Sequence, residues 1–303
     1  MRSIFTDLAM EARGAQAASR QEVTRDGIER TIVKIETPEA QEAFSRPMGV
    51  YVTLSCPQSL TIDLRTRQAL SRELAADIAG MLPKDARCVL VAGLGNRNVT
   101  PDALGPRTIE RVLVTRHMGD WLGADAQEGM RSVCAAAPGV LGATGVETAE
   151  IVRAMAEHVK PDAVIAVDAL AARSSLRICS TIQIADTGIS PGSGVGNHRR
   201  ALNRETLGVP VIAVGVPMVV YASTIAGDAL SAFAQADGAP PEDEQRLNQC
   251  VEQVVSEKLG DLIVTPREVD ALVERMAGIV AEGINLALHP GLSSADVAQL
   301  MAT

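Results

Sequence analysis

Four short runs of apolar residues constrain the fold of this 303-residue chain more than any other feature. Residues 88–92 (CVLVA) and 210–214 (PVIAV) each end at a glycine, residues 163–167 (AVIAV) end at an aspartate, and residues 180–184 (STIQI) are rich in β-forming types. Runs without polar alternation are typical of parallel strands that are covered on both faces. They predict a central sheet that is buried between layers of helices.

Helical patterns separate these runs. Residues 65–82 repeat apolar side chains every fourth position, which predicts an amphipathic helix. Thr144 and Glu147 match a capping box at the start of a helix that reaches about Lys160, and a further helix follows Thr265. Alternating strands and helices predict a three-layer α/β/α fold with a mostly parallel central sheet.

Three segments fall outside this pattern. Residues 1–46 are polar and charged and predict an extended or loosely packed N-terminal arm, and residues 47–64 contain two short runs that could each form a strand. Residues 234–248 combine glycine, paired prolines and charges, which predicts a mobile loop. Residues 8–303, these segments included, are expected to form a single domain.

Composition excludes several classes of function. The formal net charge is −9, and the chain has only one Trp, two Tyr and three Phe, which disfavours direct nucleic-acid binding. No apolar stretch is long enough to span a membrane, and no secretory signal is visible. Five scattered cysteines without C-x-x-C spacing indicate reduced thiols. A cytoplasmic protein without a disulfide framework is therefore expected.

The first candidate for chemistry is the loop that follows the run 88–92. It begins Gly93-Leu-Gly95-Asn96 and contains the carboxylate of Asp102. A dinucleotide-binding motif would need a third glycine where Asn98 stands. The loop is better explained as a polar strand end in which Asp102 acts in catalysis, or else caps the following helix.

The second candidate is Asp168, which directly follows the run 163–167. An ionised carboxylate at the end of a buried strand costs desolvation energy unless it is paired or functional. Asp168 could pair with Arg173 or cap a helix, and these structural roles stay open. Ligands of open α/β sheets bind beyond the carboxyl ends of the strands, so Asp102 and Asp168 could share one cleft. One carboxylate would then activate water while the other, protonated, polarises a carbonyl.

The third candidate is a glycine-rich stretch from Asp186 to Asn197 that includes Gly192 and Gly194. Its backbone amides could bind an anion or an extended peptide, although a structural turn explains the glycines equally well. The four histidines show no metal-binding spacing, and no G-x-S-x-G nucleophile motif is present.

Several of these blocks together resemble the germination proteases of spore-forming bacteria. The resemblance runs in order over nearly the whole chain and includes the stretches 6–11 (TDLAME), 93–106 (GLGNRNVTPDALGP), 113–117 (LVTRH), 137–148 (APGVLGATGVET), 160–173 (KPDAVIAVDALAAR), 181–188 (TIQIADTG), 192–197 (GSGVGN), 206–217 (TLGVPVIAVGVP) and 264–270 (VTPREVD).

The resemblance implies a cytoplasmic endopeptidase of the forespore and spore core that degrades small acid-soluble spore proteins during germination. It implies a phosphorylase/hydrolase-like fold, distantly similar to that of hydrogenase-maturation proteases, and a homotetrameric zymogen without a cofactor or metal. The catalytic pair would be Asp102 and Asp168. The residues that support or bind substrate would be Asn96, Asp186, Gly192 and Gly194.

Members of this family remove their own N-terminal segment. Residues 6–11 are similar to the sites cut in the substrates, which predicts self-cleavage between Asp7 and Leu8, with residues 1–7 as the pro-segment and 8–303 as the protease domain. The chain departs from the family at Arg97, where relatives have Trp, and at Ser190, where relatives have His. The loss of that His disfavours a metal site.

Two alternatives remain at this stage. One is a metal-assisted endopeptidase of the maturation type, which a chelator would inactivate. The other is a non-enzymatic module that binds a ligand through the glycine-rich loop at residues 188–196, in which case the bond between Asp7 and Leu8 would stay intact.

Overall fold

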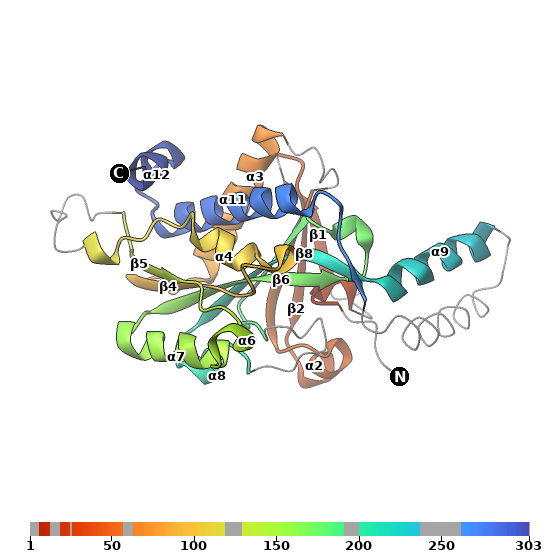
Figure 1. Ribbon diagram of the computed structural model, residues 1–303, viewed down its shortest axis with the longest axis horizontal. Helices are drawn as coiled ribbons and strands as arrows, with labels where there is room; N and C mark the ends of the chain where they lie inside the picture. Colours follow the sequence, from red (N-terminus) through yellow and green to blue (C-terminus); the bar gives the residue numbers. More distant parts are fainter. Residues whose placement is uncertain are drawn as a thin grey trace.

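A computed structural model shows one nine-stranded sheet with helices against both of its faces (Figure 1). The structure describes residues 6–12, 19–24, 26–56, 63–118, 129–190, 200–236 and 262–302. Gly192, Gly194 and most of the loop expected at 234–248 lie outside these ranges.

The sheet has the strand order β1-β2-β3-β7-β8-β6-β4-β5. The short strand β9 is not part of this order and pairs with β8. The strands are β1 (Ser19–Val23), β2 (Glu29–Ile35), β3 (Gly49–Ser55), β4 (Cys88–Gly93), β5 (Ser132–Ala136), β6 (Ala163–Ala172), β7 (Thr181–Ala185), β8 (Val211–Tyr221) and β9 (Ile263–Val264). The pairings among β5, β4, β6 and β8 are parallel, and all the others are antiparallel. The α/β class is confirmed, but the sheet is mixed rather than mostly parallel.

Helices form a layer on each face of the sheet. Helices α3 (Leu64–Met81), α4 (Leu104–Ile109) and α11 (Val269–Leu288) lie on one face, and α7 (Thr148–Val159) and α2 (Pro38–Phe44) lie on the other (Figure 1). The remaining helical elements are η1 (Ala9–Glu11), η3 (Thr100–Asp102), η4 (Arg116–Met118), α6 (Leu141–Thr144), η5 (Ser175–Arg177), α8 (Arg204–Leu207), α9 (Ala222–Ala236) and α12 (Ser294–Met301).

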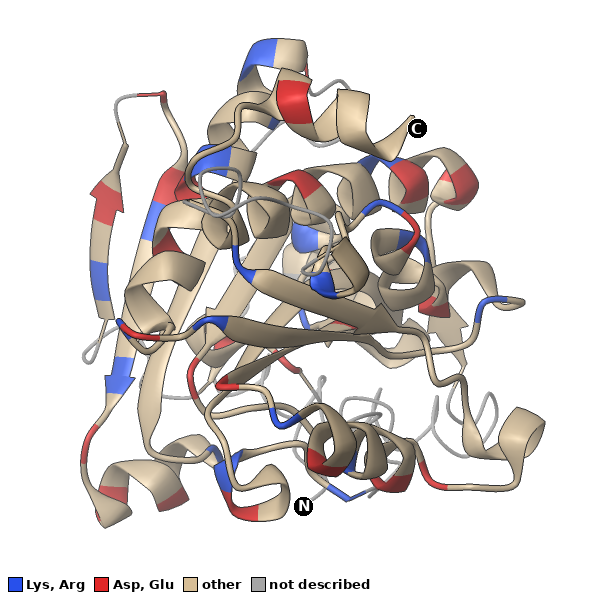
Figure 2. Cartoon of the chain, turned by 90° about the vertical axis from the view of Figure 1, so that its left-hand side faces the viewer, with Lys and Arg blue, Asp and Glu red and all other residues tan. Residues whose placement is uncertain are grey.

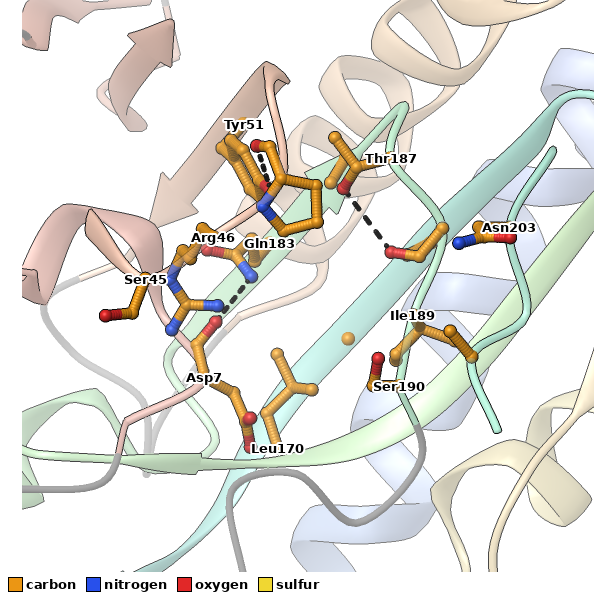
Figure 3. A pocket seen from close by; sticks show the side chains of 16 residues that line it. Asp7, Ser45, Arg46, Tyr51, Leu170, Gln183, Thr187, Ile189, Ser190 and Asn203 are labelled. Atoms are coloured by element: carbon orange, nitrogen blue, oxygen red, sulfur yellow. Dashed lines mark hydrogen bonds between the residues drawn. The ribbon is translucent and has the colours of Figure 1, made fainter. Parts of the chain in front are cut away.

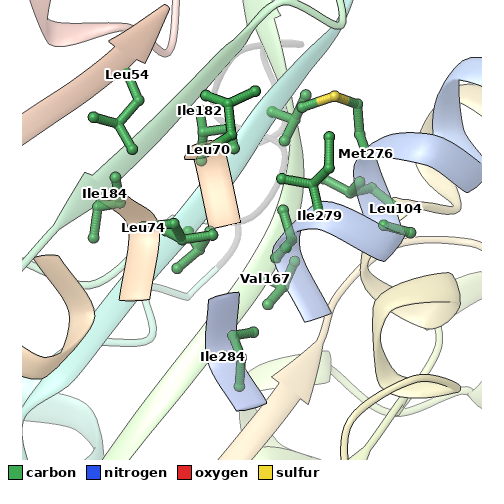
Figure 4. Close-up of a cluster of buried hydrophobic side chains, with 14 of the residues drawn as sticks. Leu54, Leu70, Leu74, Leu104, Val167, Ile182, Ile184, Met276, Ile279 and Ile284 are labelled. Carbon is green, nitrogen blue, oxygen red and sulfur yellow. The ribbon is translucent and has the colours of Figure 1, made fainter. Parts of the chain in front are cut away.

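The largest core cluster joins α3 and α11 to the sheet. Leu70 and Leu74 from α3 meet Ile279 and Ile284 from α11 above the buried strands (Figure 4). At Gly283 the two helices approach so closely that an added Cβ would lie 2.7 Å from Leu74 Cδ2. Each fully buried side chain of this size contributes about 1.5–3 kcal/mol, so this layer anchors the sheet on which the site is built.

Part of the expected N-terminal arm belongs to the sheet. β1 and β2 pair with each other, and β2 pairs with β3, so residues 19–23 and 29–35 are not a loose extension. The alternation along β2 explains the difference, because Thr31, Val33 and Ile35 are buried while the residues between them are more exposed. A strand with only one buried face has polar residues at every second position, which makes it look hydrophilic.

Other expected boundaries also shift. The helix predicted over 65–82 is confirmed as α3, whereas α7 begins at Thr148 and not at Thr144. Thr144 ends the short helix α6, because Gly145 adopts a left-handed conformation with φ of 72°. Residues 234–236 complete α9 instead of starting a loop.

Residues 47–64 contain one described strand, β3, where two strands were expected, and residues 57–62 lie outside the described ranges.

Candidate active site

A row of buried polar residues crosses the sheet at one level. Cross-strand pairing aligns Thr53 of β3 with Gln183 of β7, Gln183 with Gly215 of β8, and Gly215 with Asp168 of β6. Paired residues of neighbouring strands point to the same face, so the side chains of Thr53, Gln183 and Asp168 share one side of the sheet. All three are less than 9% exposed.

Asp168 therefore lies inside a strand rather than beyond its end. β6 continues for four residues past Asp168, because Ala169–Ala172 keep pairing with β8. The Oδ1 atom of Asp168 accepts a hydrogen bond from the amide of Ala169 at 2.9 Å. The expectation that Asp168 follows the strand is wrong, and the single carboxylate interrupts an otherwise apolar strand.

The loop after β4 brings Asp102 to the same part of the sheet. The amide of Leu94 donates to the carbonyl of Val167 at 2.8 Å, so the chain leaves β4 directly beside Asp168. The loop then closes on itself, since the amide of Asn96 donates to Oδ2 of Asp102 at 2.7 Å. The turn that contains Asp102, η3, contacts both β6 and β8. The structure thus brings Asn96 and Asp102 together in one loop, and it brings the start of that loop beside Val167, the neighbour of Asp168 in the chain.

Two glycines make this loop possible. Gly95 has φ of 104°, and a Cβ there would lie 2.1 Å from the carbonyl oxygen of Asp102. Gly105 lies at the start of α4, where a Cβ would be 2.2 Å from the carbonyl oxygen of Leu94. Only glycine permits this backbone conformation and this close approach. Gly95, the second glycine of the G-x-G sequence, therefore allows the loop to close on Asp102.

The N-terminal segment is bound to the carboxyl end of β6. The backbone amide of Asp7 donates to the carbonyl of Ala171, and the amide of Ala171 donates to Oδ2 of Asp7, both at 2.8 Å. The side chain of Gln183 donates to the carbonyl of Asp7 at 2.8 Å and accepts from the amide of Ala9 at 2.6 Å. Leu8, between them, is fully buried. The two residues predicted to flank self-cleavage are thus held on the sheet.

Charged side chains fasten this segment further. Glu11 accepts hydrogen bonds from the amides of Arg173 and Ser174 at 2.7 and 3.1 Å and forms an ion pair with Arg177. Arg46 donates to the carbonyl of Thr6. Burial lowers the pKa of the Arg46 guanidinium from its usual value, and the negative charge of Asp7 opposes this shift.

A cavity of about 200 Å³ opens beside Asp7 (Figure 3). Its wall combines residues from the N-terminal segment, the turn after α2, and strands β3, β6, β7 and β8. The lining residues include Asp7, Arg46, Tyr51, Leu170, Gln183, Thr187, Ser190, Asn203 and Gly215. Burial raises the pKa of the Tyr51 phenol, whose hydroxyl donates to the carbonyl of Pro47 at 2.9 Å. The cavity is therefore polar at one end, where Arg46 and Gln183 approach Asp7, and apolar at Leu170.

The other predicted site residues have different positions. Asp186 is exposed at the end of β7, where its Oδ1 accepts from the amide of Val50 at 2.8 Å. This bond extends the pairing of β3 with β7, which gives Asp186 a structural role. Arg97 is exposed and forms an ion pair with Glu110 at 3.2 Å. Ser190 lines the cavity.

Gln183 and Arg46 were not expected from the sequence as site residues. Gln183 does carry a signal, because it is a polar residue in the middle of the β-rich run 180–184. Arg46 carries none, since it stands in a polar stretch before Pro47. Its role depends on the position of a segment 40 residues earlier in the chain.

Charges and possible metal ligands complete the description. Acidic and basic residues are interspersed over the face shown in Figure 2. In the part of the chain that the structure describes, no group of three or more His, Cys, Asp or Glu side chains could hold a metal ion. Within the same ranges, no helix combines the length and apolar character needed to cross a bilayer.

Comparison with known proteins identifies the family. The sequence profile of the germination protease family matches residues 7–239 and 231–301. The chain belongs to the germination protease family. Germination proteases of Clostridium acetobutylicum and Caldanaerobacter subterraneus are 41% and 43% identical to it, each over 98% of both chains. The germination protease of Bacillus cereus is 39% identical over 95% of this chain and 94% of its own.

Among solved structures, a NiFe hydrogenase maturation protease from Thermococcus kodakarensis aligns with a TM-score of 0.33 and 17% identity. The alignment covers 69% of this chain and 98% of that protein. As a member of the germination protease family, this chain is a peptidase.

Proposed function

We propose that this germination protease is a self-processing endopeptidase that degrades small acid-soluble spore proteins in the forespore and spore core, and that Asp102 and Asp168 activate the attacking water. Family membership supports proteolysis in germination. Two contacts support the aspartate pair: the turn that contains Asp102 packs against β6 and β8, and the amide of Leu94 donates to the carbonyl of Val167, the residue before Asp168.

The chemistry follows from two carboxyl groups in one site. Like charges at close range disfavour double ionisation, so one carboxyl group keeps a proton. The ionised carboxylate accepts a proton from water, while the protonated one holds its proton in a hydrogen bond to the carbonyl under attack. When the C–N bond breaks, this second carboxyl group transfers that proton to the leaving amine.

One observation supports self-processing most directly. The bond between Asp7 and Leu8 is held at the carboxyl end of β6, on the strand that contains Asp168. Three residues of strand, roughly 10 Å, separate Asp168 from Ala171, which holds Asp7. In the proposed reaction, the bond between Asp7 and Leu8 closes this distance to reach the aspartates. Residues 1–7 would be the pro-segment, and the active assembly would be a homotetramer.

Replacement of each aspartate by asparagine tests this proposal. Asp102→Asn and Asp168→Asn should each abolish self-cleavage and the cleavage of a purified small acid-soluble spore protein. Asp85→Asn, in an exposed turn before β4, should cleave at the wild-type rate. Intact mass spectrometry over time and gel analysis of the substrate measure the two reactions. Full activity of either site variant would remove that residue from the mechanism, and inactivation of the wild-type enzyme by a chelator would favour a metal-assisted reaction instead.

A further inference from the structure

The side chain of Gln183 binds the backbone on both sides of the bond between Asp7 and Leu8. Its Nε2 donates to the carbonyl oxygen of Asp7, and its Oε1 accepts from the amide of Ala9. A neighbouring β-strand would bind the same pair of backbone groups, which are two residues apart. The side-chain amide therefore replaces a strand partner at the bond that is proposed to be cut.

The surroundings of Gln183 fix this amide and make its bonds costly to lose. Gln183 is 8% exposed, and its neighbours in the polar row are Thr53 on one side and Gly215 on the other. Gly215 has no side chain that could compete for the amide. A buried amide left without partners costs about 1–3 kcal/mol. Once cleavage removes Asp7, Nε2 loses its acceptor, which favours the binding of another peptide carbonyl at the same place.

We propose that Gln183 is a catalytic residue of this protease, which polarises the carbonyl of the bond to be cut and sets the register of the chain through the amide two residues later. This inference rests on the proposed function. The water oxygen bonds to the carbonyl carbon of Asp7 while one carboxylate takes a water proton. The C–N bond to Leu8 then breaks, and the other carboxyl group gives its proton to the leaving nitrogen. Throughout, the Gln183 N–H donates to the oxygen on which negative charge develops.

Self-cleavage of the full-length chain tests this role. The variants are Gln183→Met, which keeps the size of the side chain but removes both bonds, and Thr181→Val as a matched control at another buried position of β7. Intact mass spectrometry measures the rate at Asp7–Leu8, and thermal melting checks folding. We expect Gln183→Met to be about 100-fold slower, as for the loss of one donor to a developing oxyanion, and Thr181→Val to match the wild type.

A pH profile separates a chemical role from a structural one. Gln183→Glu supplies an acceptor for Ala9 at every pH, but it supplies a donor to Asp7 only while the introduced carboxyl group is protonated. Its rate relative to the wild type should therefore fall as the pH rises through the titration of that group. A role limited to filling space at this position predicts a constant ratio. If Gln183→Met does not fold, the self-cleavage rates of Gln183→Glu and Gln183→Asn are compared with the wild type instead. Gln183→Asn has a shorter side-chain amide that cannot reach the same backbone groups, so this variant should also cleave itself slowly.

Each result decides one of two questions. Wild-type rates in folded Gln183→Met, or a constant ratio for Gln183→Glu, would overturn the role of Gln183 and leave the protease function intact. A wild-type chain that never cuts at Asp7–Leu8 would overturn the proposed self-processing and this inference with it. Slow cleavage by Gln183→Met together with full activity of Asp102→Asn and Asp168→Asn would keep Gln183 and remove the aspartate pair.

Discussion

Gln183 and Asp168 face the same side of the sheet in one cross-strand row, and Gly215 is the residue between them. Two strand spacings separate their backbones by roughly 10 Å. The side chain of Leu170 covers Gly215, since a Cβ at that glycine would lie 2.5 Å from Leu170 Cδ1. The absence of a side chain at position 215 therefore leaves room for Leu170 above the sheet between Gln183 and Asp168.

We expect Gly215→Ala to impair both stability and cleavage. The added methyl group would force Leu170 away from the sheet and into the cavity beside Asp7, since Leu170 lines that cavity. Overpacking of this kind costs about 1–3 kcal/mol of unfolding free energy. Urea denaturation measures the loss, and the rate of self-cleavage should fall more than stability alone explains.

Gly278→Ala is a matched control for that change. Gly278 lies inside α11, and a Cβ there would meet no heavy atom within 4 Å. Alanine in an open helical position stabilises by about 0.5–1 kcal/mol relative to glycine, so this variant should gain stability and cleave normally. If both variants behaved alike, the contact between Gly215 and Leu170 would not explain the effect.

Glu11 should control how firmly the N-terminal segment is bound. Glu11→Ala leaves the amides of Arg173 and Ser174 without their carboxylate partner and breaks the ion pair with Arg177. We expect the amide of Ala9, which Gln183 binds, to exchange with deuterium at least about tenfold faster, because the loss of such bonds costs about 1–3 kcal/mol. Glu42→Ala, on the exposed side of α2, should leave this exchange unchanged.

The sequence was sufficient to predict the buried central strands and the closure of the loop between Asn96 and Asp102. Apolar runs identify strands that are buried on both faces, and β4, β6 and β8 all follow this rule. Asn96 and Asp102 are close in the chain, so the local G-x-G turn already determines that they meet. Local sequence is a reliable guide where both partners lie in one turn.

The rest of the site depends on pairings between distant segments. Asp168 interrupts an apolar run and so looks like a strand end, although Ala169–Ala172 continue to pair with β8. Gln183 gains its role only because Asp7 and Ala9, more than 170 positions earlier, bind to its side chain. The edge strand β1 has no buried residue and its neighbour β2 is buried on one face only, so both have the polar composition of a loose arm. These features depend on register across the sheet, which no short window of sequence specifies.

Asp77 on α3 should make stability depend on pH near 6. Burial raises the pKa of the Asp77 carboxyl to about 6, although Arg30 forms an ion pair with it. The unfolded chain ionises this group at lower pH than the folded chain does. The folded state therefore loses stability as the pH rises from about 4 to about 6, and the loss persists above this range.

Asp77→Asn removes this dependence. Asparagine resembles the protonated carboxyl group, so the variant should gain stability relative to the wild type between pH 5 and pH 7.5, on the order of 2 kcal/mol. Urea denaturation of both proteins at the two pH values measures the change. Equal differences between the proteins at both pH values would show that Asp77 ionises in the fold as easily as in the unfolded chain.

His289 should act in the opposite direction at acid pH. The side chain is fully buried at the end of α11, its Nε2 lies 3.3 Å from the carbonyl of Leu113, and its Nδ1 has no hydrogen-bond partner among the described residues. Burial lowers the pKa of His289, and the bond to Leu113 opposes this shift. Below pH 6.5 the imidazole is protonated in the unfolded chain but stays neutral in the folded chain. The free energy of unfolding therefore falls as the pH drops, by at most about 1.4 kcal/mol per pH unit.

Replacement by a side chain that does not titrate isolates this effect. His289→Gln lowers stability at pH 8 through imperfect packing, but its unfolding free energy should fall less steeply between pH 6.5 and 5 than that of the wild type. The exposed His117 offers the control, since His117→Gln should leave the slope of the wild type in place. Parallel curves for wild type and His289→Gln would mean that the buried imidazole takes up its proton without unfolding. A shallower curve for His289→Gln alone would identify the end of α11 as an acid-labile point of the fold.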